Sequence, residues 1–134
     1  MTLAAALGLL QGGNLEAAER LCGKLLKRHP GDPQTQHLMG LVLLHCARPG
    51  DALDLLKKAA KRQPDNPDCH YNLAECRRAL GKPDASFRAA VAALPGLAAA
   101  WNGLGLALRE QGRLDEAVDS WRRALGHHPI KLSR

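Results

Sequence analysis

The chain has 134 residues, of which 46% are hydrophobic and only 3% aromatic, and it carries a formal net charge of +6. Its length suits a single domain, and the excess of alanine and leucine over β-branched residues favours helices and excludes a strand-rich fold. Charged residues, glycine or proline interrupt every apolar run before the ~18 residues that a membrane span needs. The positive charge fits attraction to nucleic acid or acidic lipid, but a solvated basic surface explains it equally well.

The first predicted pair of helices covers about residues 1–32. Residues 2–10 are apolar enough to suggest the core of a secretion signal, but no basic segment leads into them. The repeat described below accounts for them as the first helix of the pair. Gly13 marks the turn between the two helices and Pro30 the end of the second, since proline cannot continue a helix.

Three further pairs follow, at about residues 33–66, 67–97 and 98–131, with a period near 34 residues. The turn positions are 34, 34 and 31 residues apart: Gly13, Ala47, Gly81 and Gly112. The prolines that end the pairs are 34, 31 and 34 apart: Pro30, Pro64, Pro95 and Pro129. The same 34, 31, 34 spacing relates the central residue of each second helix: Cys22, Leu56, Phe87 and Trp121. Such a fixed period predicts stacked copies of one helix–turn–helix unit.

The third pair lacks three residues. The turn position Gly81 still lies 34 residues after Ala47, whereas Phe87 lies only 31 after Leu56, so the deletion falls between Gly81 and Phe87. Its second helix should therefore begin about one turn late, with Pro83 at or just before its first turn. In the same pair Arg77 occupies a position that is leucine in the other three. We expect a notch into which Arg77 reaches, toward Asp84, because an unpaired buried charge is costly; the alternative is that Arg77 extends directly to solvent.

The fourth pair carries the most specific pattern. Its ordered positions are Trp101, Leu104, Gly105, Leu108, Gly112, Ala117, Trp121, Ala124 and Pro129. This pattern resembles the tetratricopeptide repeat family, and the resemblance extends over essentially the whole chain. It implies an all-α fold, a right-handed α-solenoid of four such repeats with the third shortened, forming a single domain over residues 1–134. Small residues at Ala6, Gly40, Ala74 and Gly105 would let the two helices of each pair approach closely.

The family resemblance also implies that the first helices of the pairs line a concave groove, which holds a peptide or helix of a partner protein. By register, nine residues of the last three pairs should face this groove: His37, Leu41, Leu44, Tyr71, Glu75, Arg78, Asn102, Leu106 and Arg109. The first pair adds Leu3, Leu7 and Leu10, which a subunit mate or preceding structure would otherwise have to cover. The rows change from apolar to polar, which predicts a ligand with a hydrophobic anchor and an acidic end near Arg78 and Arg109.

No motif for catalysis or for a cofactor is present, so we expect a protein that is not an enzyme. The four cysteines form no CxxC pair and fit a reduced, cytoplasmic setting. Cys69 and Cys76 share one helix face, and together with His70 and His45 they could form a metal site, but small buried thiols explain them better.

Basic residues gather late on the second helices, where they complement the helix dipole: Lys24, Lys27, Arg28, Lys57, Lys58, Lys61, Arg62, Arg122 and Arg123. No stacking aromatics interleave them, so the expected partner is a protein or peptide, with neither nucleic acid nor membrane. Two alternatives stay open. The chain could be a repeat segment of a larger enzyme such as a glycosyltransferase. It could also be a self-assembling scaffold, a homo-oligomer, because too few residues follow Pro129 to form a capping helix over Val118, Trp121 and Leu125.

Overall fold

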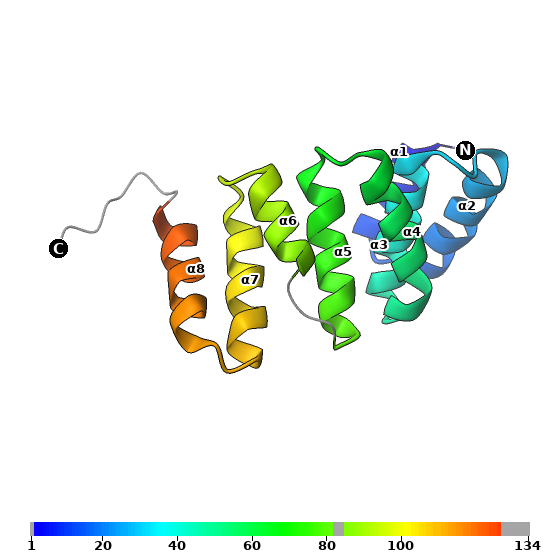
Figure 1. The fold of residues 1–134 in the computed structure, drawn as a ribbon. Helices are drawn as coiled ribbons and strands as arrows, with labels where there is room; N and C mark the ends of the chain where they lie inside the picture. Colours follow the sequence, from blue (N-terminus) through cyan, green and yellow to red (C-terminus); the bar gives the residue numbers. More distant parts are fainter. Residues whose placement is uncertain (1, 82–84, 127–134) are drawn as a thin grey trace. The chain divides into compact units, whose positions relative to one another are not determined.

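The computed structural model describes residues 2–81 and 85–126, and all of their regular structure is α-helical. The predicted all-α class with four helix–turn–helix repeats is confirmed (Figure 1). The helices are α1 (Leu3–Gln11), α2 (Leu15–Arg28), α3 (Pro33–His45), α4 (Pro49–Arg62), α5 (Pro67–Ala79), α6 (Ala85–Ala93), α7 (Ala98–Glu110) and α8 (Leu114–Gly126).

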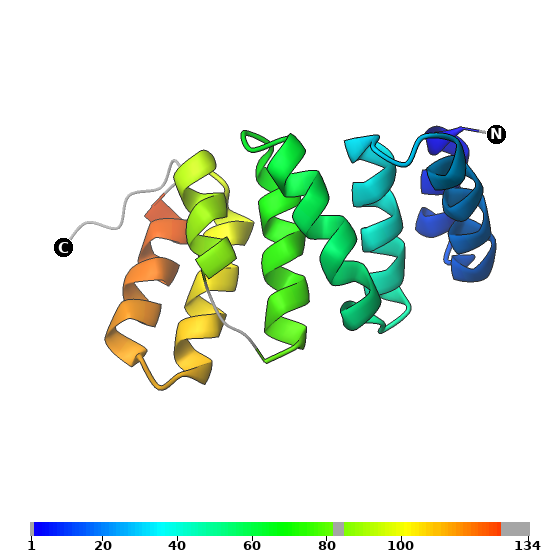
Figure 2. The same cartoon turned by 45° about the vertical axis from the view of Figure 1, so that its right-hand side comes forward.

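The helices divide into two compact units, Met1–Pro64 and Asp65–Arg134. In the first unit α3 packs against α1, α2 and α4, and in the second α7 packs against α5, α6 and α8. Figure 2 shows α3 beside α4 and α7 beside α8, each pair antiparallel. The division falls two residues before the predicted end of the second repeat, which is residue 66. The expectation of one domain over residues 1–134 stays a prediction.

Each turn between the two helices of a repeat uses the same backbone conformation. The residue at the predicted turn position has a positive φ in all four repeats: Gly13 81°, Ala47 59°, Gly81 77° and Gly112 77°. After α3 the N–H of Ala47 donates to Leu44 O at 3.0 Å and that of Arg48 to Leu43 O at 2.9 Å. This is the Schellman motif, in which a left-handed residue lets the chain satisfy the last free carbonyls of a helix. The predicted turn spacing is confirmed.

Prolines and short polar side chains set the other helix ends. The second helices α2, α4 and α6 each end two residues before a predicted proline: Pro30, Pro64 and Pro95. Pro129 lies outside the described residues. Helix α3 begins at Pro33. The carboxylate of the preceding residue, Asp32, accepts a hydrogen bond from Thr35 N at 3.1 Å. A proline at the first helical position loses no hydrogen bond, and the carboxylate satisfies an otherwise free N–H.

Helix α6 is short at its N-terminus, as predicted from the deletion. It begins at Ala85, two residues before Phe87. The other second helices begin seven residues before the equivalent positions: Cys22, Leu56 and Trp121. The difference of five residues is about one and a half turns. Pro83 and Asp84 lie outside the described residues, so the predicted notch stays a prediction, and Arg77 is half-buried.

Small residues stand where the helices of a repeat cross, and all four predicted positions are buried: Ala6, Gly40, Ala74 and Gly105. A Cβ added to Gly40 would lie 2.6 Å from Leu56 Cδ2, and one added to Gly105 would lie 2.5 Å from Trp121 Nε1. Each glycine thus provides room for the large residue at the centre of the second helix. Because protein interiors are close-packed, the small residue of the first helix and the large residue of the second helix have complementary sizes.

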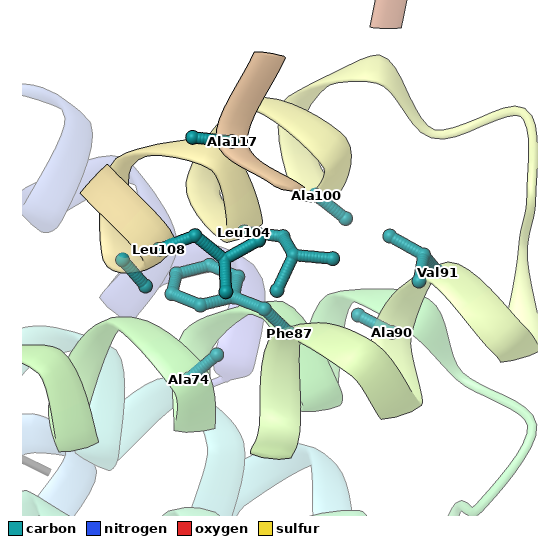
Figure 3. Packing of buried hydrophobic residues seen from close by; sticks show 9 residues of the cluster. Ala74, Phe87, Ala90, Val91, Ala100, Leu104, Leu108 and Ala117 are labelled. Carbon is teal, nitrogen blue, oxygen red and sulfur yellow. The ribbon is translucent and has the colours of Figure 1, made fainter. Parts of the chain in front are cut away.

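The core of the second unit is built around Phe87, which is completely buried. Its ring lies among Ala74 of α5 and Leu104 and Leu108 of α7 (Figure 3). A fully buried aromatic ring contributes about 3 kcal/mol through removal of its surface from water. This one ring therefore anchors the shortened α6 to its neighbours.

Candidate partner-binding surface

In the first unit the predicted binding residues are those of α3. His37, Leu41 and Leu44 follow the helical spacing of four and three residues, which places them along one face, and all three are half-buried. The residues between them, such as Leu38 and Val42, are buried in the core. The face of α3 that carries the predicted residues is thus the accessible side of a helix whose other side is packed.

The apolar row predicted on α1 is divided by the structure. Leu10 is only 8% exposed and belongs to the core with Ala6 and Cys22, whereas Leu7 is 41% exposed and Leu3 is half-buried. Leu10 therefore serves packing within the unit. Among these three leucines, Leu7 offers the most accessible apolar surface.

In the second unit α5 contributes Tyr71, Glu75 and Arg78, all half-buried. The Tyr71 ring packs edge-on against Phe87 with 5.8 Å between ring centres, and burial raises the pKa of its hydroxyl, with Glu75 adding to the rise. Arg78 Nε donates to Glu75 Oε1 at 3.0 Å. This hydrogen bond is the main reason why the pKa of Arg78 is raised. The side chains of this face are thus held in place by one another.

Helix α7 contributes the exposed Asn102, the half-buried Leu106 and the exposed Arg109. The Arg109 guanidinium lies 6.0 Å from the centre of the Trp121 ring on α8, a cation–π arrangement. Since α5 and α7 are in contact, the six predicted residues of the second unit lie on neighbouring first helices. Those of the first unit lie on α3 alone.

Glu110 is a member of this surface that the register did not predict. Its Oε2 lies 3.5 Å from Arg78 Nη1, so two carboxylates, those of Glu75 and Glu110, share one guanidinium. The sequence does place opposite charges on these two successive first helices. The ion pair can be predicted from them only when it is known that the two helices are neighbours. An acidic ligand would have to compete for Arg78, which leaves Arg109 as the more available cation.

The nine basic residues predicted late on the second helices are all exposed. One aromatic does meet them, because the Arg123 guanidinium lies 5.2 Å from the centre of the Trp101 ring. That face of the indole is already occupied by the chain's own cation, and the ring is only half-buried.

The cysteines are free thiols, and three of them, Cys22, Cys69 and Cys76, are completely buried. Burial raises the pKa of Cys22 to about 11 and also raises the pKa values of Cys69 and Cys76. The described residues contain no group of three or more His, Cys, Asp or Glu side chains that could hold a metal ion. None of the described helices is long and apolar enough to cross a membrane.

These features define a helical-repeat protein of the tetratricopeptide type. The family model for "Anaphase-promoting complex, cyclosome, subunit 3" matches residues 11–94, and the model for "Tetratricopeptide repeat" matches residues 98–129. The first match covers more than half of the chain. The chain belongs to this family of helical repeats and, with it, to the tetratricopeptide repeat proteins, as the sequence predicted.

Solved structures with the same fold include several of MamA. One, a crystal structure of MamA protein, is 20% identical, with a TM-score of 0.86 over 98% of this chain and 77% of MamA. MamA from Desulfovibrio magneticus RS-1, from residue 41 to its end, is 20% identical, with a TM-score of 0.85 over 91% of this chain and 71% of that one. MamA AMB-1 is 21% identical, with a TM-score of 0.81 over 94% and 76%. No curated protein sequence matches the chain.

Proposed function

We propose that the chain is a non-catalytic interaction module that binds a peptide or helix of a partner protein in a groove formed by its first helices. The observation that carries the proposal is that the first helices of each unit carry half-buried apolar side chains. They are Leu41 and Leu44 in the first unit and Tyr71 and Leu106 in the second. Half-buried apolar groups on a packed, rigid helix can gain from further burial without a large ordering cost. A cytoplasmic setting, suggested by the four free thiols, is part of the proposal.

The side chains of α3, α5 and α7 indicate which kind of ligand would bind. On α3 the candidate residues are mainly leucine, which suits an aliphatic or aromatic anchor. On α5 and α7 the groups are polar. Arg109 is available to an acidic group, while Glu75 and Glu110 share the single guanidinium of Arg78 and so leave one negative charge in excess that favours a basic group. A partner segment with an apolar anchor and a charged end fits these two sets of side chains.

The test is capture of a partner from a lysate of the source cells, with variants that change one face at a time. Leu41→Glu and Arg109→Glu should each abolish capture while the helical circular dichroism stays unchanged. Lys57→Glu, a charge reversal at an exposed residue of α4, is the matched control and should leave capture intact. If capture survives both first-helix substitutions, the proposed surface is wrong.

A second candidate function is self-assembly through α8. Three apolar side chains of this helix are strongly exposed: Leu114 59%, Val118 41% and Leu125 57%. In the repeats before it, the second helices α2 and α6 pack against the first helix of the next repeat. A second copy of the chain could supply the corresponding contact to α8. Light scattering over a concentration series should then show association that Val118→Glu abolishes, and a strict monomer would exclude this function.

A further inference from the structure

A basic hollow lies in the first unit, between the loop that joins α2 to α3 and the last two turns of α4. Its volume is about 640 Å³, within the range of small-ligand sites. Six residues line it: Pro30, Gly31, Gln36, Lys58, Lys61 and Arg62. None of them belongs to the first-helix residues of the proposed function, so the site is independent of that surface.

The residue at position 36 differs from its counterpart in the fourth repeat. Gln36 and Trp101 lie 65 residues apart in the sequence and occupy equivalent positions of the second and fourth repeats. Trp101 Nε1 donates to Pro95 O at 2.6 Å, and Gln36 Nε2 donates to Pro30 O at 2.9 Å. Both side chains thus tie their helix to the carbonyl of the preceding loop proline. The amide of Gln36 does so with less bulk than an indole and brings a hydrogen-bond acceptor that an indole does not have.

That acceptor has no partner. Gln36 is only 3% exposed, and its Oε1 has no hydrogen bond within the described part of the chain. The amide cannot be turned over to solve this, because its NH₂ must face the carbonyl of Pro30. A buried acceptor without a donor costs stability, so a ligand N–H or O–H group that reached Oε1 after a small movement of the Gln36 side chain would form a favourable hydrogen bond.

The charges around the hollow favour an anion. Lys58 is paired with Asp54 at 2.9 Å, but Lys61 and Arg62 have no carboxylate partner among the described residues. The Arg62 guanidinium lies against Gly31, with Nη2 only 3.3 Å from where a Cβ of that residue would be. The absence of a side chain at Gly31 allows this approach, which places the guanidinium beside the loop. Two positive charges therefore face the hollow without a counter-charge.

We propose that this hollow binds an acidic side chain of a partner segment, with the oxyanion on Lys61 and Arg62 and a backbone N–H of the segment on Gln36 Oε1. A peptide residue with a phosphate or carboxylate carries both groups a few bonds apart, which a simple anion does not. Arginine and lysine bind either oxyanion, and charge-assisted hydrogen bonds are about twice as strong as neutral ones. The chemistry of the site is thus an oxyanion beside an amide N–H.

The test is a titration of the full ¹⁵N-labelled chain, followed by the amide signals of Gly31 and the side-chain NH₂ of Gln36. The probe is N-acetyl-O-phosphoserine N-methylamide, with inorganic phosphate as the anion without the amide and N-acetylserine N-methylamide as the amide without the anion. We expect saturable shifts with the probe and at least about tenfold weaker binding of either control. N-acetylglutamate N-methylamide distinguishes the source of the oxyanion: tighter binding than the phosphoserine probe assigns a carboxylate, and weaker binding assigns a phosphate.

Three variants separate the proposed contacts from general electrostatics. Lys61→Glu with Arg62→Glu should weaken binding at least about thirtyfold. The matched pair Lys27→Glu with Arg28→Glu has the same register one repeat earlier, on α2, and should change it less than about twofold. Gln36→Trp introduces the residue found at the equivalent position of the fourth repeat. The variant should keep the fold, as measured by thermal unfolding, and should no longer bind the probe.

Several outcomes would overturn the proposal. They are the absence of saturable shifts at Gly31 and Gln36, equal effects of the two charge-reversal pairs, and equal affinity for inorganic phosphate and the probe. Binding of the probe to a folded Gln36→Trp variant would also overturn it, because the ligand would then lie elsewhere.

Discussion

Replacement of Ala47 by glycine should stabilise the chain, although it removes a side chain. Ala47 has φ 59°, in the left-handed region, while the other three turn positions are glycine. A left-handed conformation costs an L-residue with a Cβ roughly 1–2 kcal/mol. Glycine avoids that cost but loses about 0.5–1 kcal/mol more backbone entropy on folding. Since Ala47 is exposed, no buried surface is lost, and the net gain should be about 0.5–1 kcal/mol.

The assay is urea unfolding followed by helical circular dichroism, with Gly13→Ala as the reciprocal control in the same unit. A Cβ added to Gly13 would meet nothing within 4 Å, so the substitution changes only the backbone energy. It should lower the free energy of unfolding by about 1 kcal/mol. If Ala47→Gly is neutral or destabilising, or if Gly13→Ala is tolerated, the reasoning from positive φ is refuted.

Two further predictions concern the cores. Gly103→Ala should cost about 2–3 kcal/mol in urea unfolding, because the new Cβ would overlap the ring of the fully buried Phe87; a neutral result would show that the ring can move aside. A thiol reagent at pH 8 should modify the half-buried Cys46 well before the buried thiols, and equal rates would contradict their burial. Stability should also fall between pH 9 and 11, because Cys22 keeps its proton to a pKa of about 11 when folded while the unfolded thiol loses it near 9.0. Cys22→Ala should reduce that decline, and an unchanged pH profile would contradict the assigned shift.

The turns and helix ends were predictable because they depend on local chemistry. Glycine at a left-handed position and proline at a helix boundary act through their own backbones, so their spacing located the turns and the shortened α6. Even Ala47 was identified, since its position in the repeat outweighs its weak preference for the left-handed region. The family followed from the same spacing.

The details of the candidate sites were not predictable in the same way. The register placed Leu10 on the binding face, whereas the structure buries it in the core, because a short α1 must supply its own packing. The ion pair between Arg78 and Glu110 depends on which helices are neighbours. The unsatisfied oxygen of Gln36 depends on side-chain orientation. Such features follow from tertiary contacts, which a residue pattern does not specify.

The central claim is that a partner segment binds to the first helices, and amide hydrogen exchange tests it most directly. Exchange would be measured on the chain alone and with a segment recovered by capture. The account predicts slower exchange in α3, α5 and α7, with little change in α2 and α8. Protection confined to α8 would instead indicate self-assembly, and protection that leaves α3, α5 and α7 unchanged would contradict the account.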